Sequence, residues 1–135
     1  MSMVSTEERL KEIVELTRLY DVYGPLLSDH KKEIFENYIL NNYSLGEIAS
    51  MVDMSRQGVR DIVQRCSKEL YVYEDKLGFL KKMDDISEMF GKMRNSLINV
   101  KNTITNSQME SVEKTLLTNE LDVSIERMDT AMTLL

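Results

Sequence analysis

The chain has 135 residues, 42% hydrophobic and 30% charged, enough for one compact domain or a small domain with a helical extension. Its net charge of −6 argues against indiscriminate nucleic-acid binding, which usually needs a strongly basic surface. No run approaches the roughly 18 apolar residues of a membrane span, and the single cysteine, Cys66, excludes an internal disulfide framework. Because no secretory signal is recognisable, these features predict a cytoplasmic protein that does not insert into membranes.

Apolar residues recur with helical spacing along the chain, and one proline and five glycines favour long helices. Thr6, which precedes two glutamates, is expected to cap a first helix, and Gly24-Pro25 to end it. Ser28 is expected to cap a second helix from about Asp29 to Leu40, which Asn41-Asn42 breaks. Because no segment shows strand alternation, we predict an all-α fold.

Residues 43–70 have the pattern of a helix-turn-helix, two short helices joined by a tight turn. Ser44 and Glu47 form a capping-box signature at the start of the first helix. Ser55 is expected to cap the second helix, and Cys66 is interpreted as a small core residue on its buried face. The apolar positions with i, i+3, i+4, i+7 spacing are Leu45, Ile48, Ala49 and Val52, then Val59, Ile62, Val63, Cys66 and Leu70.

The outer face of the second helix is basic. Residues 55–68 contain four cations and one anion, Asp61, within a chain of net charge −6. In a helix-turn-helix, the start of this recognition helix enters the major groove, and arginine and glutamine can bond guanine and adenine bidentately. The hypothesis is that Arg56, Gln57 and Arg60 read bases. The alternative is a solvated face without a nucleic-acid partner, because Asp61 would repel phosphates. The residues expected to hold the phosphate backbone are Ser55, Gln64, Arg65 and Lys68.

A different pattern begins after Gly78, so we predict a helix-turn-helix domain in residues 1–78 and a helical hairpin or dimerisation region in 79–135. A break is expected at Thr105-Asn106, a second capping box at Ser107 and Glu110, and an interruption at Thr118–Glu120. The two helices could fold back on each other or pack against a second protomer. We favour a homodimer, which would pair two half-site readers. The heptad seam expected at the interface comprises Met83, Ile86, Phe90, Met93, Leu97, Val100 and Ile104.

Catalytic chemistry finds no support in the sequence. The single histidine, His30, lies beside Asp29 at a predicted helix start, and no serine is suitably placed as a nucleophile. There is no glycine-rich phosphate loop and no metal-ligand spacing of cysteine and histidine. We therefore expect no enzyme activity, no metal and no cofactor.

Three phrases carry a resemblance to a known family: YSLGEIA at 43–49, MSRQGV at 54–59 and YEDKLGF at 73–79. They resemble the YlxM family of helix-turn-helix proteins of Gram-positive bacteria, and the first two are also similar to region 4 of bacterial sigma factors, which reads promoter DNA. The resemblance covers residues 26–78 of the chain.

The resemblance implies a cytoplasmic protein whose gene tends to lie beside those for the signal recognition particle, and which acts in or regulates that protein-targeting pathway. Its expected partners are DNA, or the RNA of the signal recognition particle, and the GTPase of that particle. Two functions stay open. One is a regulatory protein that binds nucleic acid. The other is an adaptor that binds the GTPase or its RNA without reading DNA.

Overall fold

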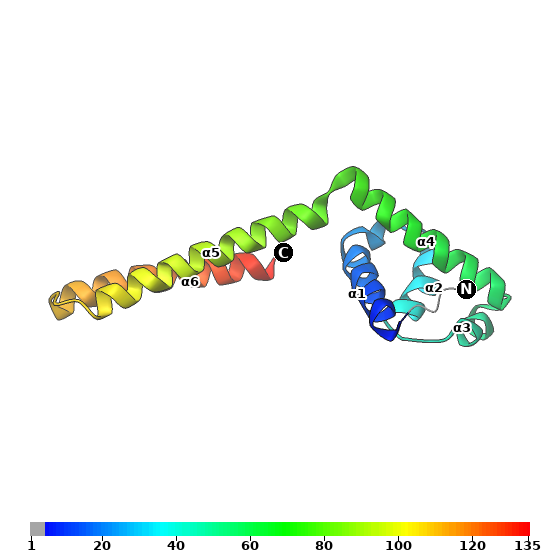
Figure 1. The fold of residues 1–135 in the computed structure, drawn as a ribbon, viewed down its shortest axis with the longest axis horizontal. Helices are drawn as coiled ribbons and strands as arrows, with labels where there is room; N and C mark the ends of the chain where they lie inside the picture. The colour runs from blue at the N-terminus through cyan, green and yellow to red at the C-terminus, as the bar shows by residue number, and fades with distance from the viewer. Residues whose placement is uncertain (1–4) are drawn as a thin grey trace. The chain divides into compact units, whose positions relative to one another are not determined.

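The structure, a computed structural model, describes residues 5–135, which form six α-helices, one short 3-10 helix and no β-strand (Figure 1). The predicted all-α fold with a helix-turn-helix followed by long C-terminal helices is confirmed. Two compact units are present, one ending at Leu80 and the other spanning Lys81–Leu135. In chain order the elements are α1 (Thr6–Tyr23), η1 (Gly24–Leu26), α2 (Asp29–Ile39), α3 (Leu45–Val52), α4 (Arg56–Leu77), α5 (Phe79–Thr105) and α6 (Ser111–Thr133).

The first helix begins one residue earlier than its sequence predicts, because Ser5 and not Thr6 is its N-cap. The hydroxyl of Ser5 accepts a hydrogen bond from the Glu8 amide at 3.2 Å, and the Glu8 carboxylate accepts one from the Ser5 amide at 3.1 Å. This reciprocal capping box needs a glutamate or glutamine three positions after the cap. Ser5 has Glu8 there, whereas Thr6 would have Arg9.

The other predicted boundaries of the first unit lie where they were expected. α1 ends at Tyr23, and Pro25 occupies the short 3-10 helix that follows. Ser28 is the N-cap of α2 through its extended backbone, without a side-chain hydrogen bond. Asn42 adopts the left-handed conformation, with φ of 54°, that ends this segment. Local turn chemistry therefore determines these breaks.

The core of the first unit forms where α1, α2 and α3 pack against α4. Phe35 and Ile34 of α2 are completely buried, and the ring of Phe35 lies 5.8 Å from that of Tyr20 in α1. The predicted apolar faces of the helix-turn-helix are confirmed. Their buried members are Ile48, Ala49, Val59, Val63, Cys66 and Leu70, and Leu45, Val52 and Ile62 pack partly buried against them.

The junction between α4 and α5 is held by a side-chain cap. Gly78 ends α4 in the left-handed conformation, with φ of 63°. The Tyr23 hydroxyl donates to the Glu74 carboxylate at 2.6 Å and accepts from the Phe79 amide at 3.1 Å. The same carboxylate accepts from the Leu80 amide at 3.1 Å. These bonds satisfy amides that the first turn of a helix leaves without partners.

The second unit is an antiparallel hairpin of α5 and α6 (Figure 1). Two ion pairs join the helices, Arg94 with Asp129 at 2.7 Å and Lys101 with Asp122 at 2.6 Å. Apolar burial is sparse, because α5 has no buried residue and α6 buries only Met128. Partly exposed ion pairs contribute only about 0–1 kcal/mol each. The hairpin by itself therefore gains little from burial.

Two local predictions for this hairpin are wrong. Ser107 and Glu110 form no capping box: Glu110 is the N-cap of α6 without a side-chain bond, and Ser107 donates to the Ile104 carbonyl at 2.6 Å. α6 also runs without interruption through Thr118–Glu120. The Thr118 hydroxyl donates to the Lys114 carbonyl at 2.8 Å, so its polar group is satisfied inside the helix. None of the described helices is long and apolar enough to cross a membrane.

Two groups with raised pKa values, the buried Cys66 and the more exposed Tyr71, make stability sensitive to alkali. Burial raises the pKa of the Cys66 thiol to about 11, from 9.0. Burial and then the hydrogen bond to Glu15 raise the pKa of Tyr71 to about 12, from 10.0. A group whose pKa is higher in the folded chain contributes stability below its unfolded pKa, and this contribution is lost as the pH rises toward the folded value.

We expect the free energy of unfolding, measured by urea titration, to be level near neutral pH and to fall above about pH 9. Cys66→Ala removes the titrating thiol and should make the decline between about pH 9 and 11 less steep. Equal slopes in the variant and the wild type would show that Cys66 is not protected in the folded chain.

Candidate nucleic-acid interface

The helix-turn-helix is set by side-chain caps at both helix starts. The Ser44 hydroxyl accepts from the Glu47 amide at 3.1 Å, but Glu47 makes no return bond to the Ser44 amide, so only half of the predicted capping box forms. Asp53, with φ of 52°, makes the turn, and the Ser55 hydroxyl accepts from the Gly58 amide at 3.0 Å. A Cβ at Gly58 would lie 3.1 Å from that hydroxyl oxygen, so glycine keeps the cap uncrowded. The start of α4 is thereby fixed in direction.

All seven residues predicted to contact nucleic acid lie on the surface of α4 or at its N-cap, and all are exposed. No ion pair engages Arg56, Arg60, Arg65 or Lys68 within residues 5–135. Some cations elsewhere in the chain are paired, as Lys31 is with Glu69 at 3.3 Å. Four positive charges on one helix are therefore available to an external anion.

Gln57 has a partner inside the chain. Its side-chain amide donates to the Asp61 carboxylate, one turn further along α4, at 2.9 Å. A glutamine that reads adenine needs both its amide nitrogen and its amide oxygen. Gln57 must therefore leave Asp61 before it can read a base. Asp61 itself shares a shallow surface hollow with Gln64, Arg65 and Lys68.

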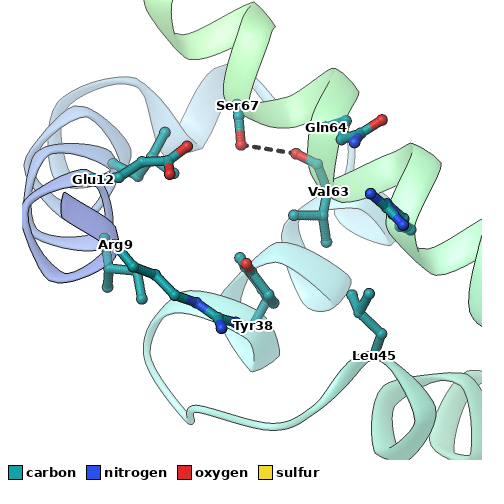
Figure 2. A pocket seen from close by; sticks show the side chains of 10 residues that line it. Arg9, Glu12, Tyr38, Leu45, Val63, Gln64 and Ser67 are labelled. Atoms are coloured by element: carbon teal, nitrogen blue, oxygen red, sulfur yellow. Dashed lines mark hydrogen bonds between the residues drawn. The ribbon is translucent and has the colours of Figure 1, made fainter. Parts of the chain in front are cut away.

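The structure divides the predicted contact residues between two sides of α4. Arg60 and Gln64 line a groove of about 470 Å³ between α4 and α1 (Figure 2). Arg56 lines an adjoining hollow of about 510 Å³ at the start of α4. Arg65 and Lys68 lie in the shallow hollow with Asp61 and take no part in the groove. Successive residues of a helix are about 100° apart, so Arg60 lies beside the buried Val59 and not opposite it.

Arg9 is the cation that the sequence pattern missed. It belongs to α1, 51 positions before Arg60, yet both line the groove. Figure 2 shows the Arg9 side chain reaching from α1 toward Tyr38 of α2, with Glu12 one turn further along α1. Only the packing of α1 against α4 joins these residues, and no local spacing signals it.

The predicted dimer seam of α5 also divides in two. Met83, Phe90, Leu97 and Ile104 are half-buried, whereas Ile86, Met93 and Val100 are 44%, 49% and 48% exposed. The half-buried and the exposed residues alternate along the heptad. This pattern indicates that one side of the helix packs against a neighbour and that the adjacent side is exposed to solvent. Val112 and Leu116 of α6 are also exposed, at 69% and 65%.

Within the described residues, no group of three or more histidine, cysteine, aspartate or glutamate side chains is arranged to hold a metal ion. Cys66 is completely buried, and its raised pKa keeps it a thiol near neutral pH. A thiol in that state is a weak nucleophile. The site on α4 is thus one of exposed cations and amides, suited to binding.

Comparison with known proteins gives one family. The family described as "Putative helix-turn-helix protein, YlxM / p13 like" matches residues 10–120. A UPF0122 protein of Caldanaerobacter subterraneus is 49% identical over 79 residues, 58% of this chain and 68% of that protein. YlxM of Bacillus subtilis is 39% identical over 85 residues, 63% of this chain and 77% of that protein.

A third relative, from Halalkalibacterium halodurans, is 31% identical over 121 residues, which cover 90% of this chain and 97% of that protein. No solved structure matches the chain. The match of residues 10–120 spans the helix-turn-helix and most of the C-terminal hairpin. The chain therefore belongs to the YlxM/p13-like family of helix-turn-helix proteins, the family that its motifs resemble.

Proposed function

We propose that this protein is a helix-turn-helix regulator that binds nucleic acid through the exposed face of α4. The observation that carries the proposal is the set of four cations on α4 that no carboxylate of the described chain neutralises. They project from a helix whose start is held by Ser55 and whose far side is buried. A rigidly placed, unneutralised basic helix is the element by which this motif engages a duplex.

The roles of the individual residues follow from their positions. Arg56, Gln57 and Arg60 lie in the first turns of α4 and would contact base edges. Arg65 and Lys68, further along the helix, would contact phosphates. The Ser55 hydroxyl accepts from the Gly58 amide, which leaves its own proton to donate to a phosphate oxygen.

The acidic surroundings lower the affinity of this interface. The whole chain carries −6, and Asp61 lies within the proposed contact face. A phosphate backbone is therefore attracted only at close range, where the cations of α4 outweigh the more distant acids. We infer that binding is weak at physiological salt. It is confined to phosphates that come close to the cations of α4 and is therefore not indiscriminate.

Replacing Arg56 and Arg60 together with alanine should weaken binding to duplex DNA or structured RNA by at least about tenfold, since each bidentate arginine–base pair contributes roughly 1–3 kcal/mol. The salt dependence of the affinity should become flatter, because fewer counterions are released. Fluorescence anisotropy over a salt series measures both. The double variant Lys11→Ala/Lys76→Ala removes the same charge outside α4's first turns and serves as control. Unchanged binding by the arginine variant would contradict the recognition-helix assignment.

A homodimer would place two α4 helices on one nucleic acid. The hairpin of α5 and α6 supports this part of the proposal, because the open half of its seam (Ile86, Met93 and Val100) is 44–49% exposed in the part of the chain that the structure describes. Two such hairpins can form a four-helix bundle, which buries the apolar sides that one hairpin leaves in water. Burial contributes about 25 cal/mol for each Å² of apolar surface removed from water.

Light scattering at micromolar concentration should give twice the 15.7 kDa of one chain. Ile86→Glu/Met93→Glu places charges in the open half of the seam and should return the mass to that of a monomer. Leu40→Glu/Met51→Glu alters two exposed apolar residues of the first unit and should leave the dimer intact. A monomeric wild type would exclude the dimer.

We further propose that the regulator acts in the signal recognition particle pathway. The family resemblance supports this more specific role. The second candidate is an adaptor that binds the GTPase of that particle. Its supporting observation is the exposed apolar surface of the hairpin, which includes Val112 and Leu116 at 69% and 65% exposure. Large exposed apolar residues that gather on one surface often mark the site of a protein partner.

A pull-down distinguishes the two candidates. The tagged chain is incubated with Bacillus subtilis extract, half of it treated with nuclease, and the GTPase is detected by immunoblot. The regulator predicts that nucleic acid is recovered and that nuclease abolishes the GTPase signal. Recovery of the GTPase after nuclease would favour the adaptor, and its absence from both halves would exclude the link to the pathway.

A further inference from the structure

The groove between α1 and α4 continues into the hollow at the start of α4. The two spaces share four lining residues, Arg9, Ile13, Tyr38 and Leu45, so together they form one furrow across the first unit. We call it the α1–α4 groove. Figure 2 shows its first part, with α1 on one wall, α4 on the other and Tyr38 of α2 and Leu45 of α3 between them.

The floor of the groove is aliphatic. Ile13 and Leu45 are half-buried, and Leu16 and Val63 are core residues whose edges reach the groove. The hydroxyl of Ser67, on the α4 wall, donates to the Val63 carbonyl at 2.9 Å and so presents little polarity (Figure 2). Such a surface binds apolar side chains, which lose contact with water when they enter it.

The rim of the groove carries three guanidinium groups, those of Arg9, Arg56 and Arg60. None of the three makes an ion pair in the part of the chain that the structure describes. Two acids, Glu12 and Glu47, also line the furrow, which leaves an excess of positive charge. An aliphatic floor with an unneutralised arginine rim is complementary to a ligand that is apolar on one side and acidic at its edges.

We propose that the α1–α4 groove binds an acidic amphipathic helix of a partner protein. Leucine-type side chains spaced one turn apart would enter the two hollows, and flanking carboxylates would bond the three arginines. A single-stranded nucleic acid fits the groove less well, because its bases stack on aromatic faces, whereas the floor is aliphatic and only Tyr38 and Tyr43 among the lining residues are aromatic.

The groove shares Arg56 and Arg60 with the nucleic-acid interface. A bound acidic helix would occupy both side chains and exclude nucleic acid from the start of α4. This competition rests on the proposed function, but peptide binding itself does not. Arg9 is not one of the seven residues predicted to contact nucleic acid, so a change at Arg9 tests the groove alone.

The probe is a fluorescein-labelled 16-residue peptide with leucines at i, i+4 and i+7 and glutamates at the flanking positions. Its two controls replace the leucines with alanine or the glutamates with lysine. Arg9→Ala should weaken binding of the acidic peptide by about tenfold, the loss expected for one charge-assisted hydrogen bond. Lys11→Ala, an equal change of charge on another side of α1, should not. Methyl shifts in the NMR spectrum should change for Ile13, Leu16 and Leu45.

Equal affinities of Arg9→Ala and Lys11→Ala, or shifts confined to α5 and α6, would overturn the proposal. The proposal would also be overturned if the peptide does not bind and a labelled single-stranded RNA binds in a way that depends on Arg9. Duplex binding is measured on the same two variants. Because Arg9 is not part of the α4 interface, duplex binding that survives in Arg9→Ala leaves the proposed function standing whether or not the peptide binds.

Discussion

The helix-turn-helix unit depends on one packing constraint, the burial of a single stripe of α4 against the three helices before it. Val59, Cys66 and Leu70 are completely buried, and α4 contacts α1, α2 and α3 along this stripe. Loss of a buried aliphatic side chain typically costs about 2–5 kcal/mol, against a total stability of roughly 5–15 kcal/mol for a domain. The stripe therefore holds α4 in one rotation about its axis, and that rotation decides which side chains meet solvent.

Because the rotation is set by the core, α4 presents two different surfaces. Arg56 and Arg60 face the groove beside α1, whereas Arg65 and Lys68 lie in the shallow hollow that contains Asp61. One helix can thus serve a nucleic acid and a protein segment with overlapping residues. In an acidic protein of net charge −6, such overlap gives a physical basis for regulation, because an acidic partner competes with phosphates for the same guanidinium groups.

Local chemistry explains which parts of the fold were predictable. The caps at Ser44 and Ser55, the left-handed Gly78 and the buried position of Cys66 each depend on residues within one or two turns. Two of the errors concern hydroxyl side chains. Thr6 stands beside the true cap Ser5, and Thr118 bonds back within its own helix and so breaks nothing. Arg9 and Arg60 line the same groove only because α1 packs against α4, and no periodic pattern in the sequence indicates this packing.

The central claim is that nucleic acid contacts the start of α4, and photochemical crosslinking of the purified full-length chain tests it most directly. The chain is irradiated with pools of random duplex DNA and of structured RNA, digested, and the crosslinked peptides are identified by mass spectrometry. The account predicts crosslinks within residues 55–68, with Arg56, Gln57 and Arg60 most heavily modified. Crosslinks confined to α5 and α6, or none with either pool, would contradict it.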